Sequence, residues 1–205
     1  MALIVLLDQH DSRTQPDLIG EWQAGLNRVL GDQLALPFTR TAGDEMQAVL
    51  GRPEALGEVA RRALASGSWW MGVGIGEIEE PRPKDLREGR GSAFWSARDA
   101  IRKAKGQRRA RPVAVIGAPE CGDTPDWLDE SLGALAFIIS RRTEAQRRAA
   151  DAYDESGASV QRVAERLNLS VQGARQRIVA AGCEEADDLI RLTGRIAARV
   201  TEPWD

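Results

Sequence analysis

Two carboxylates in this sequence stand where a divalent metal ion could be held. Asp8 ends the apolar run 2–7, and Asp44 lies in a turn within the segment RTAGDEMQAVLG, residues 40–51. If the run and the turn belong to neighbouring strands, the carboxylates repel each other unless a proton or a cation intervenes. Mg²⁺ prefers carboxylates together with phosphate oxygens, which is the chemistry of phosphoryl transfer. The alternative is that each Asp is solvated and serves its own turn.

The spacing of apolar residues predicts the elements that must position these groups. Strands are predicted at 2–7, 34–40, 46–51, 69–80 and 112–119, and helices at 15–31, 53–67 and 92–105. The turn at Gly43-Asp44 joins two strands into a hairpin, which a purely parallel sheet would not contain. The order favours a four-stranded antiparallel sheet with two helices on one face, a ferredoxin-like or palm arrangement.

The chain after residue 125 has only helical patterns. Helices are predicted at 126–140, 143–156, 159–168, 170–181 and 184–199. We therefore predict an α+β protein, with a sheet domain at 1–125 and an all-α domain at 126–205.

Composition excludes several classes of protein. The 205 residues are 42% hydrophobic and 29% charged, which is enough for a folded core. Cys121 and Cys183 lack the spacing of a zinc site or a disulfide framework, and a single histidine excludes a histidine metal cluster. With no apolar stretch approaching 18 residues, we expect a cytoplasmic protein without a membrane span.

A glycine series marks the fourth predicted strand. Gly72, Gly74 and Gly76 alternate with apolar residues and leave one face of the strand bare. Glycine inside a strand often means that something approaches closely, either a packed helix or a ligand.

Four motifs in order resemble the SatD family. They are Asp8 followed by Ser12-Arg13, GDEMQ at 43–47, GVGIGEI at 72–78 and GSAFWSARDAI at 91–101. More distantly, the same motifs resemble the palm domains of class III nucleotide cyclases and GGDEF proteins. That resemblance implies a Mg²⁺ site at Asp8 and Asp44.

The resemblance also implies nucleotide or phosphate binding by Arg98, with Gly74, Gly76 and Arg40 as further candidates. Phe94 stands where the cyclases carry an Asn that contacts phosphate. Losing such a donor typically costs about 2.7–4 kcal/mol of transition-state stabilisation. A nucleotide-binding domain is therefore favoured over an efficient cyclase, and no catalytic residue is assigned. Arg98 could instead form an ion pair with Asp8 or Asp44.

Residues 143–182 have the layout of a helix-turn-helix. Ser159 and Ser170 stand at the starts of two short helices as N-caps, and LNLS at 167–170 is a tight turn. The pattern resembles the helix-turn-helix of sigma-region-4-like and MarR-like regulators.

The second of these helices has a polar face suited to DNA. Its predicted core positions are Val171, Ala174, Ile178 and Ala181. Gln suits adenine edges, and Arg suits guanine or phosphate. The predicted contacts with double-stranded DNA are Ser170, Gln172, Gly173, Arg175, Gln176 and Arg177. The alternative is a helical hairpin that packs on the sheet domain or on a second subunit.

Charge sets a limit on DNA binding. Residues 141–182 carry eight basic and five acidic side chains, although the whole chain is at −3. A monomer with few phosphate contacts binds weakly, so we expect a homodimer reading two half-sites. The apolar stripe of helix 184–199 would be either the dimer contact or a cover for the core.

These patterns favour a DNA-binding transcriptional regulator whose sheet domain senses a nucleotide or a metal. The alternative is a nucleotidyl cyclase or related metal-dependent phosphoryl-transfer enzyme. A third possibility is an adaptor that uses its helical domain for protein contacts.

Overall fold

The computed structural model describes residues 1–106 and 111–200. Its strands are β1 Ala2–Gln9, β2 Leu34–Ala42, β3 Glu45–Leu50, β4 Trp69–Gly76 and β5 Val113–Gly117. Its α-helices are α1 Ile19–Leu30, α2 Ala55–Ser66, α3 Ser92–Lys105, α4 Thr124–Ser140, α5 Glu144–Glu155, α6 Val160–Arg166, α7 Val171–Ala180 and α8 Cys183–Ala197. Three short 3₁₀ turns are η1 Gly31–Gln33, η2 Leu86–Glu88 and η3 Pro119–Cys121.

The five strands form one mixed sheet in the order β2-β3-β1-β4-β5. β1 is antiparallel to both β3 and β4, whereas β4 and β5 are parallel. The expectation of four antiparallel strands was therefore wrong. α3 makes a crossover from β4 back to the same edge of the sheet, and a helical crossover returns the chain in the parallel direction.

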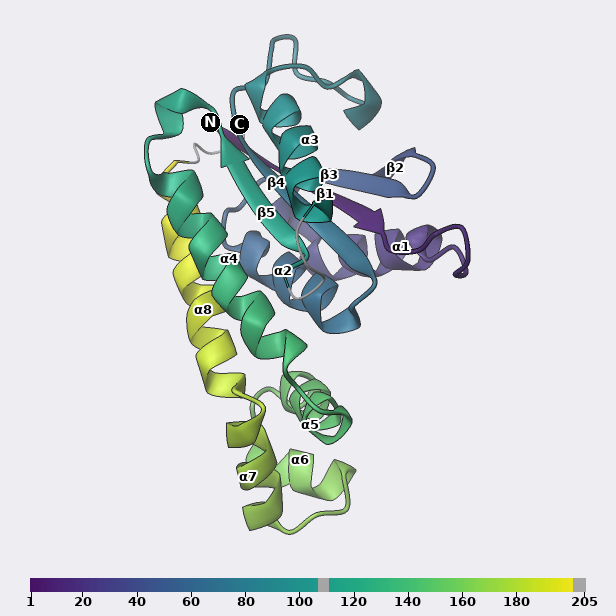
Figure 1. Ribbon diagram of the computed structural model, residues 1–205, viewed down its shortest axis with the longest axis vertical. Coiled ribbons are helices and arrows are strands. Elements are labelled where there is room, and N and C mark those ends of the chain that lie inside the picture. The colour runs from purple at the N-terminus through teal and green to yellow at the C-terminus, as the bar shows by residue number, and fades with distance from the viewer. Residues whose placement is uncertain (107–110, 201–205) are drawn as a thin grey trace.

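Successive side chains of each strand point to opposite faces of the sheet, so that the sheet has two faces (Figure 1). One face carries Ile4, Leu6 and Val49, which pack with α3 and with Leu86 of the preceding loop. The other face packs on α1 and α2, with α4 and α8 beside them. Helices thus cover both faces, whereas the sequence predicted them on one face only.

Core membership divides the chain differently from the predicted boundary at 125. Leu128, Leu132 and Leu135 of α4 and Ala186 of α8 share the core of the sheet. Residues of α5, α6 and α7 form a separate core around Val163, together with Cys183 at the start of α8. The three helices, Glu144–Ala180, therefore form a small unit placed between α4 and α8, and we call them the three-helix unit.

The two chain connections to the three-helix unit lie side by side. Arg142, after α4, is buried and donates from Nε to the carbonyl oxygen of Ala181, at 2.8 Å. Gly182 has a left-handed φ of 60° and lies against Ile138 of α4. In Figure 1 the unit projects from the end of α4 and α8 that is far from the loop above α3.

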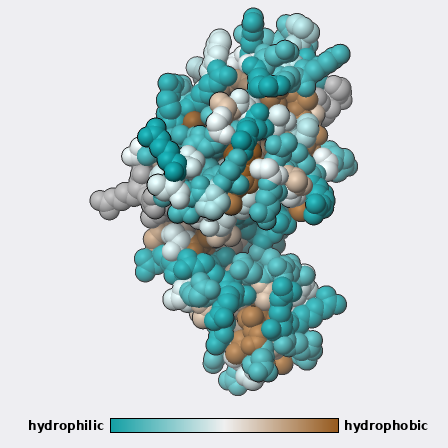
Figure 2. Space-filling model, turned by 90° about the vertical axis from the view of Figure 1, so that its right-hand side faces the viewer, coloured by the Kyte–Doolittle hydropathy of each residue, from teal (hydrophilic) through white to brown (hydrophobic). Residues whose placement is uncertain are grey.

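The surface is mostly hydrophilic on the side shown in Figure 2, with a small apolar area on the lower part and further apolar atoms scattered over the upper part. In residues 1–106 and 111–200, no helix is long and apolar enough to cross a membrane.

Candidate functional site

The two predicted metal-binding carboxylates lie close together. β1 pairs with β3 so that Asp8 is directly opposite Glu45, and the main-chain nitrogen of Gln9 donates to the carbonyl oxygen of Asp44, at 3.0 Å. The prediction that the first strand runs beside the Gly43 hairpin is confirmed. Asp8 is buried, and Asp44 and Glu45 are half-buried.

Lys105 supplies the positive charge opposite Asp8. Its Nζ lies 2.5 Å from Oδ2 of Asp8. Burial raises the pKa of Asp8, and the charge of Asp44 raises it further, while Lys105 opposes both. A hydrogen bond from the Ser12 hydroxyl lowers the pKa of Asp44. Burial raises the pKa of Glu45, against the hydrogen bond that Thr41 donates to it.

A Mg²⁺ ion would find suitable donors here, but not a complete site. Hard cations take carboxylate oxygens, and Asp8 and Asp44 lie close enough for their charges to interact. Within the described ranges, however, no group of three or more Asp, Glu, His or Cys residues is arranged to hold a metal. Lys105 already contacts an oxygen that a metal would use, so a metal at Asp8 would compete with this ammonium group.

The glycine series of β4 is covered by α3. A Cβ added to Gly74 would lie 2.3 Å from the carbonyl oxygen of Ala93 and from the main-chain nitrogen of Ala97. A Cβ at Gly76 would lie 2.4 Å from the Ser92 hydroxyl oxygen. Of the two interpretations of the series, helix packing is the one that the structure supports. The bare face predicted to receive a nucleotide at Gly74 and Gly76 is filled by the helix.

The two predicted arginines lie on different faces of the sheet. Arg40 is paired with Met46, which is paired with Leu7, so it is on the face away from Asp8; its guanidinium lies 2.5 Å from the carboxylate of Asp17. Arg40 therefore does not join the site. Arg98 is exposed on α3 and lies close enough to Glu45 for its charge to offset part of the rise that burial causes in the pKa of that carboxyl.

The expected alternative for Arg98, an ion pair with Asp8 or Asp44, is not formed in the described structure, where Lys105 takes that place. Phe94, at the position of the cyclase Asn, is 1% exposed and belongs to the core under α3. Its ring lies against Gly89, where an added Cβ would be 2.2 Å from the ring. This side chain is therefore structural.

Capping hydrogen bonds define the helices of the three-helix unit. Ser159 accepts from the main-chain nitrogen of Arg162, and Ser170 accepts from that of Gly173, at 3.1 Å. Between α6 and α7, Asn168 has a φ of 52°. A Cβ on Gly173 would lie 3.2 Å from the Ser170 hydroxyl oxygen, so glycine keeps this cap uncrowded.

α7 has one buried face and one exposed face. Ala174, Ile178 and the following Ala181 are buried, as predicted, but Val171 is 48% exposed. Val171 is the first residue of α7 and does not belong to the core formed by α5, α6 and α7. The predicted DNA-contacting side chains Ser170, Gln172, Arg175 and Gln176 are exposed, whereas Gly173 and Arg177 are half-buried.

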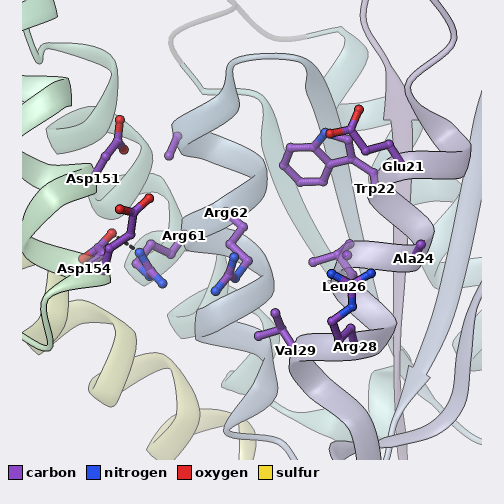
Figure 3. A pocket seen from close by; sticks show the side chains of 13 residues that line it. Glu21, Trp22, Ala24, Leu26, Arg28, Val29, Arg61, Arg62, Asp151 and Asp154 are labelled. Carbon is purple, nitrogen blue, oxygen red and sulfur yellow. Dashed lines mark hydrogen bonds and ion pairs between the residues drawn. The ribbon is translucent and has the colours of Figure 1, made fainter.

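A cleft of about 700 Å³ separates the three-helix unit from the sheet domain (Figure 3). α1 forms one wall with Trp22 and Val29, and α5 forms the opposite wall with Asp151 and Asp154. Arg61 of α2 spans the gap to an ion pair with Asp154. This ion pair is a contact between the three-helix unit and the sheet domain in addition to the two chain segments that connect them.

Three features of the site were not predicted. Lys105, which was not among the predicted site residues, supplies the cation beside Asp8. It belongs to the basic stretch 102–111, of which residues 107–110 lie outside the described residues. His10 is buried against the Trp70 ring with Nδ1 3.1 Å from the carbonyl oxygen of Gly67. The loop between β4 and α3 forms a cavity with α3. A lysine in a helix that also carries Arg102 and Lys103 is a weak signal in a sequence.

No family model matches the chain, and no curated protein matches it. The resemblance to the SatD family and to the cyclase palm domains stays a prediction.

Proposed function

We propose that this protein is a DNA-binding transcriptional regulator in which residues 143–182 act as a helix-turn-helix and the sheet domain senses a nucleotide. The observation that carries the proposal is that α7 has one buried face and one exposed polar face. Ala174 and Ile178 hold the helix in its own small core, while Gln172, Arg175 and Gln176 face solvent. Side chains near the start of a recognition helix contact base edges in the major groove, and these types suit such contacts.

The three-helix unit is well placed for this role. It projects from the sheet domain, and α5 and α6 buttress α7 from one side. We propose a homodimer, because a unit with a net charge of +3 over residues 141–182 forms few phosphate contacts alone. The stripe on α8 does not supply the contact, because Leu189, Ile196 and Val200 pack against the core of the sheet and only Leu192 is substantially exposed.

A cyclase is the weaker proposal. Phe94 is a core residue, and Lys105 neutralises one of the two carboxylates. Neither arrangement favours turnover of a nucleoside triphosphate.

The test is selection of a DNA sequence from random duplexes, followed by fluorescence anisotropy on the enriched duplex. We expect Arg175→Ala with Gln176→Ala to weaken specific binding at least 10-fold, since each good base contact is worth about 1–3 kcal/mol. Arg195→Ala on the exposed side of α8 removes the same charge and is the matched control. If no sequence is enriched, or if the double variant binds as tightly as the control, the proposal is wrong.

A further inference from the structure

The loop between β4 and α3 forms a cavity of about 890 Å³ with the first half of α3. Its outer wall is loop 79–90 and its inner wall includes Trp95 and Arg98. This volume is within the range of small-molecule sites. Its lining does not include the covered glycines of β4 or the carboxylates Asp8, Asp44 and Glu45, although Arg98 of the lining lies close enough to Glu45 for the two charges to interact.

The loop is held in place by packed residues. Leu86 is 2% exposed in the core under α3, and Gln47 of β3 donates from Nε2 to its carbonyl oxygen, at 2.9 Å. At the base of the loop, the main-chain nitrogen of Glu79 donates to the carbonyl oxygen of Arg90, at 3.1 Å. These contacts hold the loop against β3 and α3, so the cavity is a fixed part of the folded structure.

Positive charge dominates the lining. Five basic and three acidic side chains border the cavity. Arg87 is paired with Asp85. Lys84, Arg90 and Arg98 are exposed and form no ion pair with another residue of the described structure. Three cations that form no ion pair in the described structure border this cavity, although Arg98 also lies near the charge of Glu45. Together they favour a ligand with several negative charges.

An indole stands among these cations. Trp95 is 58% exposed, although tryptophan is usually well buried. Arg98 follows it by three positions in α3, so both side chains lie on the same face of the helix. An exposed aromatic side chain beside arginines is suited to stacking on a planar ring that carries phosphates.

From these contacts we infer that the cavity between loop 79–90 and α3 binds a nucleoside phosphate, with Trp95 stacked on the base and Lys84, Arg90 and Arg98 facing the phosphates. The inference deepens the sensor half of the proposed function. It moves the ligand from the β4 glycines, where α3 leaves no space, to the outer side of α3.

The test measures binding to the full chain by calorimetry, with ATP, tripolyphosphate and adenosine as separate probes. EDTA is present, so that a metal at Asp8 and Asp44 makes no contribution. We expect ATP to bind, and tripolyphosphate and adenosine each to bind more weakly. Trp95→Ala should weaken ATP binding roughly 5- to 100-fold and leave tripolyphosphate unchanged. Arg90→Gln with Arg98→Gln should weaken both phosphate probes.

Trp127→Ala is the matched control, since Trp127 is 43% exposed on α4, away from the cavity. The inference is overturned if ATP does not bind, if ATP and tripolyphosphate bind equally, or if Trp95→Ala behaves like Trp127→Ala. Circular dichroism confirms that each variant is folded. Because no DNA is used, failure of this test leaves the DNA-binding proposal standing, and failure of the DNA test leaves this one standing.

Discussion

Replacing Gly74 by alanine tests how closely α3 packs on β4. The added Cβ would lie 2.3 Å from main-chain atoms of Ala93 and Ala97, and 2.7 Å from the Cα atom of Ala97. Carbon atoms pack best at about 3.5–4.0 Å, so α3 must retreat by roughly 1 Å. Because the obstacle is helix backbone, no side chain can move aside to relieve the contact.

Overpacking a core typically costs about 1–3 kcal/mol and occasionally more. With backbone on both sides, we expect Gly74→Ala to lose about 3 kcal/mol of unfolding free energy. For a chain of this size that lowers the melting temperature by about 6–12 °C. Urea unfolding followed by tryptophan fluorescence and circular dichroism measures the loss.

Gly25→Ala in α1 is the matched control, because nothing lies within 4 Å of its added Cβ. Inside a helix this change should stabilise the protein by up to about 1 kcal/mol. A Gly74→Ala variant as stable as the wild type would show that α3 does not rest on the β4 glycines, and the site for a ligand would have to be reconsidered.

The carboxylate pair and the α7 cap give three further predictions. The pKa of Asp8 is raised in the folded state, so the protonated carboxyl stabilises the fold at low pH, and this contribution is lost as the pH rises above 3.8, the ordinary pKa of an Asp. Asp8→Asn should therefore raise the melting temperature more at pH 7 than at pH 4. An equal change at both pH values would contradict this. Lys105→Met leaves Asp8 without its cation and should cost about 1–2 kcal/mol at pH 7 by urea unfolding. Millimolar MgCl₂ should restore part of this loss if Asp8 and Asp44 can bind a metal, and none if they cannot. Ser170→Ala should cost about 1 kcal/mol and speed hydrogen exchange at the Gly173 amide, whereas faster exchange throughout the chain would show a different role.

Local sequence patterns predicted the elements well, because each depends on near neighbours. The helix predicted at 92–105 has those bounds in the structure, and the Gly43 turn joins β2 and β3 as expected. The prediction that the hairpin lies beside the first strand is confirmed, and it brings Asp44 close to Asp8, whereas the direct pairing of Asp8 with Glu45 was not predicted.

Features that depend on how elements pack were harder to predict. The glycine series of β4 signalled a close approach, but a sequence does not say whether a helix or a ligand approaches. Lys105 meets Asp8 from 97 positions away because α3 packs across β4 and β1. Val171 fits the apolar period of α7 yet is exposed, since the period does not show where the neighbouring helices end.

A ligand in the proposed cavity lies at the opposite end of the molecule from α7 (Figure 1), so a regulator needs a structural link between them. Asp129 of α4 provides one. Its carboxylate accepts from the main-chain nitrogen of Val115 in β5 at 2.7 Å and from Arg111 at 2.6 Å, and it lies 3.4 Å from Nζ of Lys103 in α3. A shift of α3 would therefore change the contact between Lys103 and Asp129 of α4, the helix that leads directly to the three-helix unit. A ligand changes DNA binding only if it has different affinities for the two positions of α3.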